Sequence, residues 1–166
     1  GSEMCIRDRA SAVICAKAGA NVTLVGRSLE KAEKIAGICN DRYDSKNVKG
    51  GADADKSDFF KVADIVLNTG AAGIQLMCEE HIKNSNTLKI CADTNAVPPS
   101  GIAGVDVMDN GKVIDMSPSK CLGIGALAIG NIKYKSQHEC LKLMYTSEKP
   151  VYLDFEDAFK FAQKSV

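Results

Sequence analysis

The sequence lacks several features that would assign a function directly, and each absence excludes a class of protein. Its 21 basic and 21 acidic side chains cancel, so no basic excess supports sequence-independent binding to nucleic acid. No apolar run approaches the roughly 18 residues of a membrane span, and no charged-then-apolar signal peptide opens the chain. We therefore expect a cytoplasmic protein that binds neither nucleic acid nor membrane.

The seven cysteines include no Cys-x-x-Cys pair, which is the common spacing of metal and redox sites. They are scattered along the chain, and several have apolar neighbours in sequence, where cysteine behaves as a small hydrophobic residue. Their odd number also argues against a complete set of disulfides. We expect reduced thiols in the core and no metal site.

A glycine-rich phosphate loop is missing as well, because no Gly-x-Gly-x-x-Gly precedes residue 10. In dinucleotide-binding folds, the amides of such a loop hold the pyrophosphate at a helix N-terminus. Residues 1–9 show no strand alternation and no capping signal, and we interpret them as a non-native leader resembling a translated sequencing adapter. A helix is predicted from Ala10 to Gly19, and the strand that should precede it is also absent.

The segment from Asn21 to Lys31 predicts a strand, a turn and the start of a helix, with Ser28 as the N-cap. In dinucleotide-binding folds an acid at this turn binds a ribose 2′-hydroxyl, whereas an arginine accommodates a 2′-phosphate. This turn carries Arg27, Ser28 and Lys31, and no acid before Glu30. The expected cofactor of such a fold is NADP. Solvated surface charges are the alternative interpretation of Arg27 and Lys31.

Strand and helix patterns alternate along the rest of the chain, which is typical of an α/β fold. The first half predicts a helix over 28–43, a strand near 47–48, a helix over 57–62, a strand over 63–68 and a helix over 73–81. The second half predicts a strand over 88–93, a hairpin of strands 105–107 and 113–116, a helix ending near 146 and a last helix capped by Asp154 with Asp157. His81 is expected to have a surface or capping role. The predicted fold is a Rossmann-like, doubly wound, mostly parallel sheet without its first strand.

Two loops follow predicted strands at the sheet edge where open α/β sheets bind ligands. The glycine loop consists of Gly70, Ala71, Ala72 and Gly73, whose small side chains either admit a cofactor or simply allow a tight turn. The proline loop, residues 95–99, contains Pro98 and Pro99, which fix its backbone. Asn95 can bind a nicotinamide carboxamide or a substrate carbonyl, or it can form an Asx-turn.

Three segments, residues 26–32, 93–102 and 125–135, resemble the C-terminal half of NADP-dependent methylene-tetrahydromethanopterin dehydrogenases. The resemblance runs from about residue 10 to the end, and its most particular motif is Asn95-Ala96-Val97-Pro98-Pro99. It implies an NADP-binding domain over 10–166 and an oxidoreductase of one-carbon metabolism. That enzyme transfers hydride between methylene-tetrahydromethanopterin, or its tetrahydrofolate analogue, and NADP.

The resemblance also implies a set of cofactor-binding residues and no catalytic acid or base, since the reacting atoms belong to cofactor and pterin. The implied cofactor-binding residues are Arg27, Ser28, Lys31, Gly70, Ala71, Ala72, Gly73, Asn95 and Pro98. The full-length parent is expected to be a homo-oligomer. This chain is expected to be an N-terminally truncated fragment, inactive by itself. A shikimate-dehydrogenase or glutamyl-tRNA-reductase type of enzyme and a non-catalytic nucleotide-binding module are the alternatives.

Overall fold

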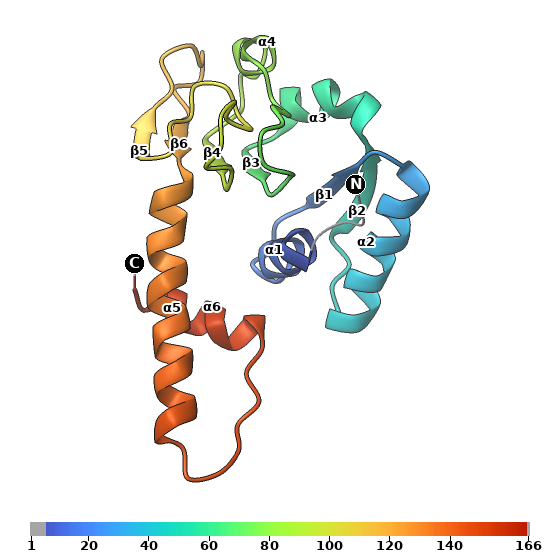
Figure 1. Cartoon of the computed structure of the whole chain (residues 1–166). Helices are drawn as coiled ribbons and strands as arrows, with labels where there is room; N and C mark the ends of the chain where they lie inside the picture. Colours follow the sequence, from blue (N-terminus) through green and yellow to red (C-terminus); the bar gives the residue numbers. More distant parts are fainter. Residues whose placement is uncertain (1–5, 166) are drawn as a thin grey trace.

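The computed structural model describes residues 6–165 and divides them between two small sheets and the helices around them (Figure 1). The helices are α1 (Ile6–Lys17), α2 (Leu29–Tyr43), the 3-10 turn η1 (Asp53–Asp55), α3 (Lys56–Val62), α4 (Glu79–Lys83), α5 (Ala126–Thr146) and α6 (Phe155–Gln163). The strands are β1 (Val22–Gly26), β2 (Val48–Ala52), β3 (Ile65–Asn68), β4 (Ile90–Asp93), β5 (Asn110–Val113) and β6 (Leu122–Ile124).

Both sheets are mainly parallel, which confirms the predicted α/β class. β1 pairs with β2 in parallel, from Val22 opposite Val48 to Gly26 opposite Ala52. The second sheet has the order β3-β4-β6-β5, in which β5 alone is antiparallel. Across the view in Figure 1 the strands follow the order β5, β6, β4, β3, β1, β2, so β1 and β3 are the neighbouring strands of the two sheets.

Each sheet has its own apolar core. The first core lies between α1, α2 and the two-stranded sheet, and the second surrounds β4. At Gly50 a Cβ would lie 2.4 Å from the Glu33 amide nitrogen, so α2 packs directly on the β2 backbone. Cys39 belongs to the first core, and Cys91 and Cys121 belong to the second, where burial and the Cys121 thiol raise the pKa of Cys91. These three cysteines are the core thiols that the sequence predicts.

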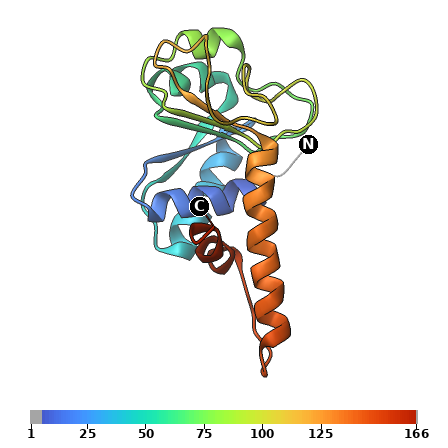
Figure 2. The same ribbon diagram turned by 90° about the vertical axis from the view of Figure 1, so that its left-hand side faces the viewer.

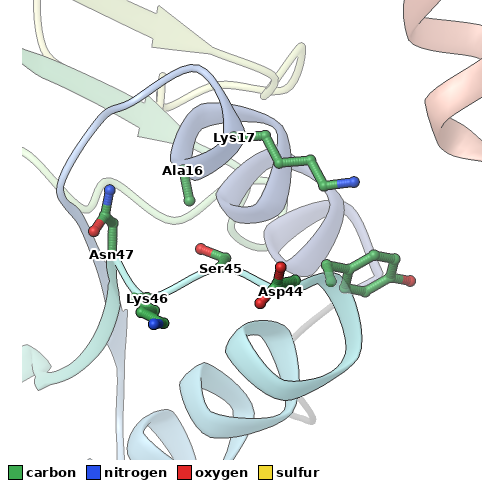
Figure 3. Close-up of a pocket in the computed structure, with 7 residues that line it drawn as sticks. Ala16, Lys17, Asp44, Ser45, Lys46 and Asn47 are labelled. Atoms are coloured by element: carbon green, nitrogen blue, oxygen red, sulfur yellow. The ribbon is translucent and has the colours of Figure 1, made fainter.

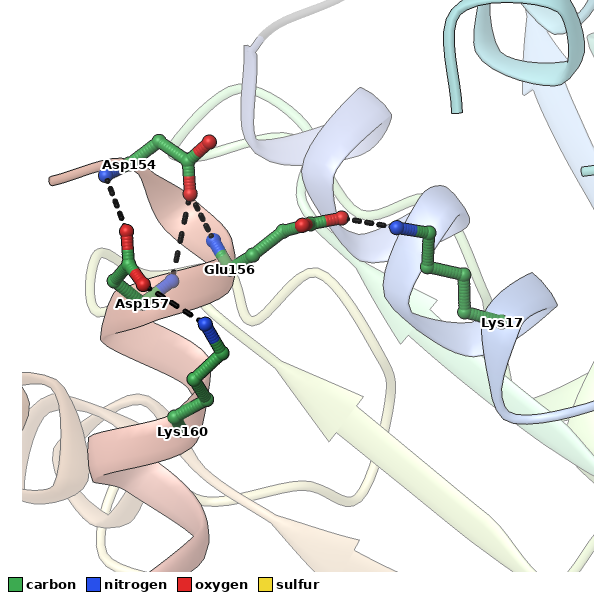
Figure 4. Close-up of polar contacts among 5 residues, drawn as sticks. All are labelled: Lys17, Asp154, Glu156, Asp157 and Lys160. Carbon is green, nitrogen blue, oxygen red and sulfur yellow. Dashed lines mark hydrogen bonds and ion pairs between the residues drawn. The ribbon is translucent and has the colours of Figure 1, made fainter. Parts of the chain in front are cut away.

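The C-terminal helices form an arm that returns to the first core. α5 continues from β6 and runs away from the sheets, and α6 packs back between α5 and the α1–α2 pair (Figure 2). Phe155 contacts Tyr43 edge-on at 5.4 Å between ring centroids, and Glu156 pairs with Lys17 of α1 (Figure 4). Asp154 and Asp157 form the predicted capping box at the start of α6. No helix within residues 6–165 is long and apolar enough to cross a membrane.

The helix before β1 begins at Ile6, four residues earlier than predicted. Residues 6–9 of the expected leader therefore form the first turn of α1, and residues 1–5 lie outside the described part of the chain. Within this turn Asp8 accepts a hydrogen bond from the hydroxyl of Thr69. Of the charged residues in this turn, Arg7 is exposed, whereas Asp8 and Arg9 are half-buried.

The predicted helix over 73–81 is wrong for most of its length, because α4 begins only at Glu79. The backbone before it is extended against residues 101–103: the amides of Leu76 and Met77 donate to the Gly101 carbonyl, and Ala103 donates to Met77. A tertiary ladder of this kind outweighs the local helical pattern. His81 takes the predicted capping role, since its Nδ1 accepts from the Cys78 amide at 3.2 Å.

The predicted hairpin is also displaced along the chain. Residues 105–107 form no strand, because the Asp109 carboxylate accepts from the Asp106 amide and Asp106 accepts from Met108, closing a turn. The hairpin forms instead between β5 and β6, with Val113 opposite Leu122. Polar side chains that bond to nearby amides compete with strand pairing, which explains the shift.

Candidate functional site

The turn after β1 presents two cations beside a helix N-terminus. Ser28 is the N-cap of α2, and its hydroxyl accepts from the Lys31 amide at 3.4 Å. The Arg27 and Lys31 side chains are exposed, and within residues 6–165 neither forms an ion pair. A helix N-terminus carries a partial positive charge, so this corner attracts an anion. It provides the charge and donors that a phosphate monoester needs.

The glycine and proline loops begin at a buried polar network formed by the last residues of β3 and β4. Asp93 is 1% exposed and Asn68 is 4% exposed, and the Asn68 amide donates to Asp93 Oδ1 at 2.7 Å. Asn68 Oδ1 accepts from the Gly70 amide at 3.0 Å, which fixes the start of the glycine loop. The amides of Asn95 and Ile102 donate to the two Asp93 oxygens at 2.9 and 3.0 Å, which fixes both sides of the proline loop.

Asn95 is 5% exposed, and its side chain joins the two loops. Its Oδ1 accepts from the amides of Val97 at 3.0 Å and Gly73 at 3.4 Å, and its Nδ2 donates to the Pro99 carbonyl at 2.9 Å. The bond to Val97 is the Asx-turn that the sequence offered as the alternative to ligand binding. These bonds use the side-chain oxygen twice and leave one amide N–H for any further partner.

The small residues of the two loops lie at the surface. Ala71, Ala72 and Pro98 are exposed, and Gly73 adopts a φ of +77°, a conformation that favours glycine. The structure thus brings the glycine loop and the proline loop together as one rigid unit. Within residues 6–165 no hydrogen bond or ion pair joins these loops to the Arg27 corner, which belongs to the other sheet.

A pocket of about 550 Å³ lies away from this unit, where α1 and α2 end (Figure 3). Its lining runs from Ala16 and Lys17 to residues 43–47, and the Ser45 hydroxyl in it is buried without a hydrogen-bond partner among the described residues. The 15 residues of α2 separate this pocket from Ser28 by about 22 Å, at 1.5 Å per residue. It is therefore distinct from the predicted cofactor site.

Asn68 and Asp93 are site residues that the sequence analysis did not select. Each is the last residue of an apolar strand, and the carboxyl ends of neighbouring parallel strands meet at one edge of a sheet. A polar residue ending each of two consecutive buried strands was the available signal. Strand periodicity alone does not show that the two side chains bond to each other.

Comparison with known proteins identifies two curated relatives. The NAD(P)-dependent methylenetetrahydromethanopterin dehydrogenase of Methylorubrum extorquens is 38% identical over 155 residues, which cover 92% of this chain and 52% of that protein. The bifunctional protein MdtA of the same organism is 35% identical over 149 residues, covering 88% of this chain and 50% of that protein. No protein-family model matches the chain.

These matches confirm the resemblance that the three motifs predict. The aligned region covers nearly all of this chain, so it includes the turn after β1 and both loops. The chain spans about half the length of the curated relatives it matches.

Proposed function

We propose that this chain is the NADP-binding half of an oxidoreductase of one-carbon metabolism. The full-length enzyme transfers hydride between methylene-tetrahydromethanopterin, or methylene-tetrahydrofolate, and NADP. The observation that carries the proposal is the 38% identity to a dehydrogenase of that name across 92% of the chain. The half that the chain represents is the C-terminal one, with a Rossmann-like fold over residues 10–166.

The residues present fit one end of NADP well. The exposed Arg27 and Lys31 side chains and the N-terminus of α2 offer positive charge to a 2′-phosphate. The nearest acid, Glu30, is also exposed, and its carboxylate forms no ion pair with any residue in the described part of the chain. The sequence offers no glycine-rich turn for the pyrophosphate. The chain therefore supplies the contacts that select NADP over NAD, and only part of the contacts that hold the dinucleotide.

The bound cofactor supplies the hydride acceptor, so this chain needs no acid or base of its own for that step. The glycine and proline loops hold a flat ligand in place with small side chains and a fixed backbone. Their rigidity comes from the Asn95 bonds to Gly73 and Pro99. Hydride transfer depends steeply on the distance and angle between donor and acceptor, so rigid loops favour it.

A direct test compares this chain with the longest natural reading frame that contains it. The longer protein should reduce NADP with methylene-tetrahydromethanopterin or methylene-tetrahydrofolate, and the absorbance of the NADPH formed measures this reaction. We also expect the longer protein to be a homo-oligomer and to be located in the cytoplasm. The 166-residue chain should show no dehydrogenase activity and should bind NADPH only weakly, measured by fluorescence titration. Micromolar NADPH affinity in the short chain would refute the claim that its binding site is incomplete.

Two other functions make different predictions in the same assay. An enzyme of shikimate-dehydrogenase type would reduce NADP with a hydroxy acid and ignore the pterin. A non-catalytic module would bind nucleotide without oxidising either substrate. The proline loop favours the pterin enzyme, since the resemblance to that family is most particular there.

A further inference from the structure

Asp93 is a buried carboxylate that accepts hydrogen bonds from three different segments of the chain. It accepts from the Asn68 side chain on β3, from the Asn95 amide at the start of the proline loop, and from the Ile102 amide beyond that loop. All three donors are uncharged amides. Burying a carboxylate costs free energy unless its oxygens are satisfied, and three of these bonds satisfy most of its capacity.

The network adds to the backbone pairing of the two strands that carry it. β3 and β4 already pair along their backbones from Ile65 opposite Ile90 to Asn68 opposite Asp93. The side-chain hydrogen bonds hold residues beyond the ends of the strands. Asn68 accepts from the Gly70 amide, and Asp93 accepts from the Asn95 amide. Gly101 packs directly against the network, since a Cβ added there would lie 1.7 Å from Asn68 Nδ2.

We propose that Asp93 is a positioning residue for the nucleotide site, an inference that rests on the function proposed above. Its carboxylate does not contact the cofactor. It sets the glycine loop through Asn68 and the proline loop through the Asn95 amide, so that one buried group aligns both loops against the same ligand. The nicotinamide half of the dinucleotide should depend on Asp93, whereas the 2′-phosphate half should depend on Arg27.

The test variant is Asp93→Asn in the longest natural reading frame that contains this chain. The new side chain keeps the shape of aspartate but replaces one acceptor oxygen with a donor, which faces another amide N–H in the network. NADPH affinity should fall about tenfold, the cost of an unmade buried hydrogen bond. Affinity for 2′,5′-ADP, which carries the 2′-phosphate and lacks the nicotinamide, should stay within about twofold because its site is on the other sheet.

Asp109→Asn is the matched control. Asp109 is also buried, at 7% exposure, and its Oδ2 accepts from the Asp106 amide at 2.8 Å, but it contacts neither loop. Its loss should affect stability without separating the affinities of the two ligands. If Asp93→Asn fails to fold, Asn68→Ala replaces it, since that change removes the bonds to both Asp93 and Gly70.

The outcomes separate this proposal from the proposed function. A selective loss of NADPH affinity supports the positioning role. An equal loss for both ligands, or no loss for either, overturns it. If the unmodified protein binds neither NADPH nor 2′,5′-ADP, the proposed function itself is wrong, and the role of Asp93 in nucleotide binding is rejected with it.

Discussion

Single side chains divide the candidate site into two parts with different physical demands. At the corner after β1 the proposed contribution is charge, and the Arg27 and Lys31 side chains there are exposed. At the loops after β3 and β4, Asn68, Asp93 and Asn95 are buried and hydrogen-bonded to one another or to the loop backbone, so geometry is the proposed contribution of this part. A substitution in the first part should change selectivity, and one in the second should change stability as well.

Replacing Arg27 by aspartate should reverse the charge at the proposed 2′-phosphate position. In the longest natural reading frame, the preference for NADP over NAD in kcat/KM should fall by about tenfold or more, since a charge-assisted hydrogen bond contributes about 1.5–3 kcal/mol. Lys34→Asp makes the same charge change at an exposed α2 position after the first turn. An unchanged cofactor ratio in Arg27→Asp, or an equal change in Lys34→Asp, would remove Arg27 from the site.

Gly101→Ala should destabilise the protein through the buried network. The added Cβ would lie 1.7 Å from Asn68 Nδ2 and 2.9 Å from Asp93 Oδ1, and moving either side chain away would break its hydrogen bonds in the network. Overpacking of this kind costs about 1–3 kcal/mol in the free energy of unfolding, which denaturant titration measures. Gly130→Ala is the control, because its Cβ meets nothing within 4 Å inside α5 and should stabilise by about 0.5–1 kcal/mol. A neutral Gly101→Ala would contradict the packing described.

The sequence predicted which residues end the strands but not which hydrogen bonds their side chains form with one another. The exposure of Arg27 and Lys31 was predictable, because both follow a strand directly, at a turn and in the first helical turn; their contact with a 2′-phosphate stays a prediction. The choice between an Asx-turn and a ligand contact for Asn95 stayed open, since both need the same residue type. Only the positions of Gly73, Val97 and Pro99 around it show which bonds its side chain makes.

Among the elements, α4 shows most clearly how a tertiary contact defines a helix boundary. The preceding residues 74–77 have a helical pattern in sequence, but Gly101 and Ala103 hold Met77 in an extended bridge opposite Ile102. α2, by contrast, begins at its predicted N-cap Ser28 because that signal is local. A helix start with a strong local cap was therefore predictable, and one shifted by distant backbone bonds was not.

The start of α4 should weaken as the pH falls, because its capping residue is a histidine. Burial, followed by the charge of Lys56, lowers the pKa of His81, and its Nδ1 accepts from the Cys78 amide only when unprotonated. A lowered folded pKa means that this contribution to stability is fully present above the ordinary value of about 6.5. It is lost progressively as the pH falls below that value and through the folded pKa.

Hydrogen exchange at the Cys78 amide, followed by NMR between neutral and mildly acidic pH, measures this effect. Protection relative to intrinsic exchange should decline with decreasing pH in the unmodified chain. His81→Gln is the control, since glutamine at this position can accept the same bond without titrating. Equal pH dependence in the two proteins would show that His81 protonation does not control the cap.

At the scale of the whole molecule, the division into two sheets leaves β1 and β3 each with one partner strand. Sequence patterns predicted these strands individually, but such patterns do not predict the order in which the strands pair. The order follows from crossover connections and packing of α1 and α2 on one sheet and of the proline loop on the other. The outward amides of an unpaired strand edge have no backbone partners, so they should exchange hydrogen with water faster than paired amides.

The amides of β1 should therefore exchange hydrogen at two different rates in this chain. Val22 donates to the Asn47 carbonyl at 2.8 Å, and because successive amides of a strand point in opposite directions, Leu24 also faces β2. Thr23 and Val25 face away from β2, toward the open edge. Amide exchange measured by NMR at low protein concentration should be slow at Val22 and Leu24 and at least about tenfold faster at Thr23 and Val25. Equal protection at all four residues would mean that another strand covers β1, and that the two-sheet arrangement is wrong for the chain in solution.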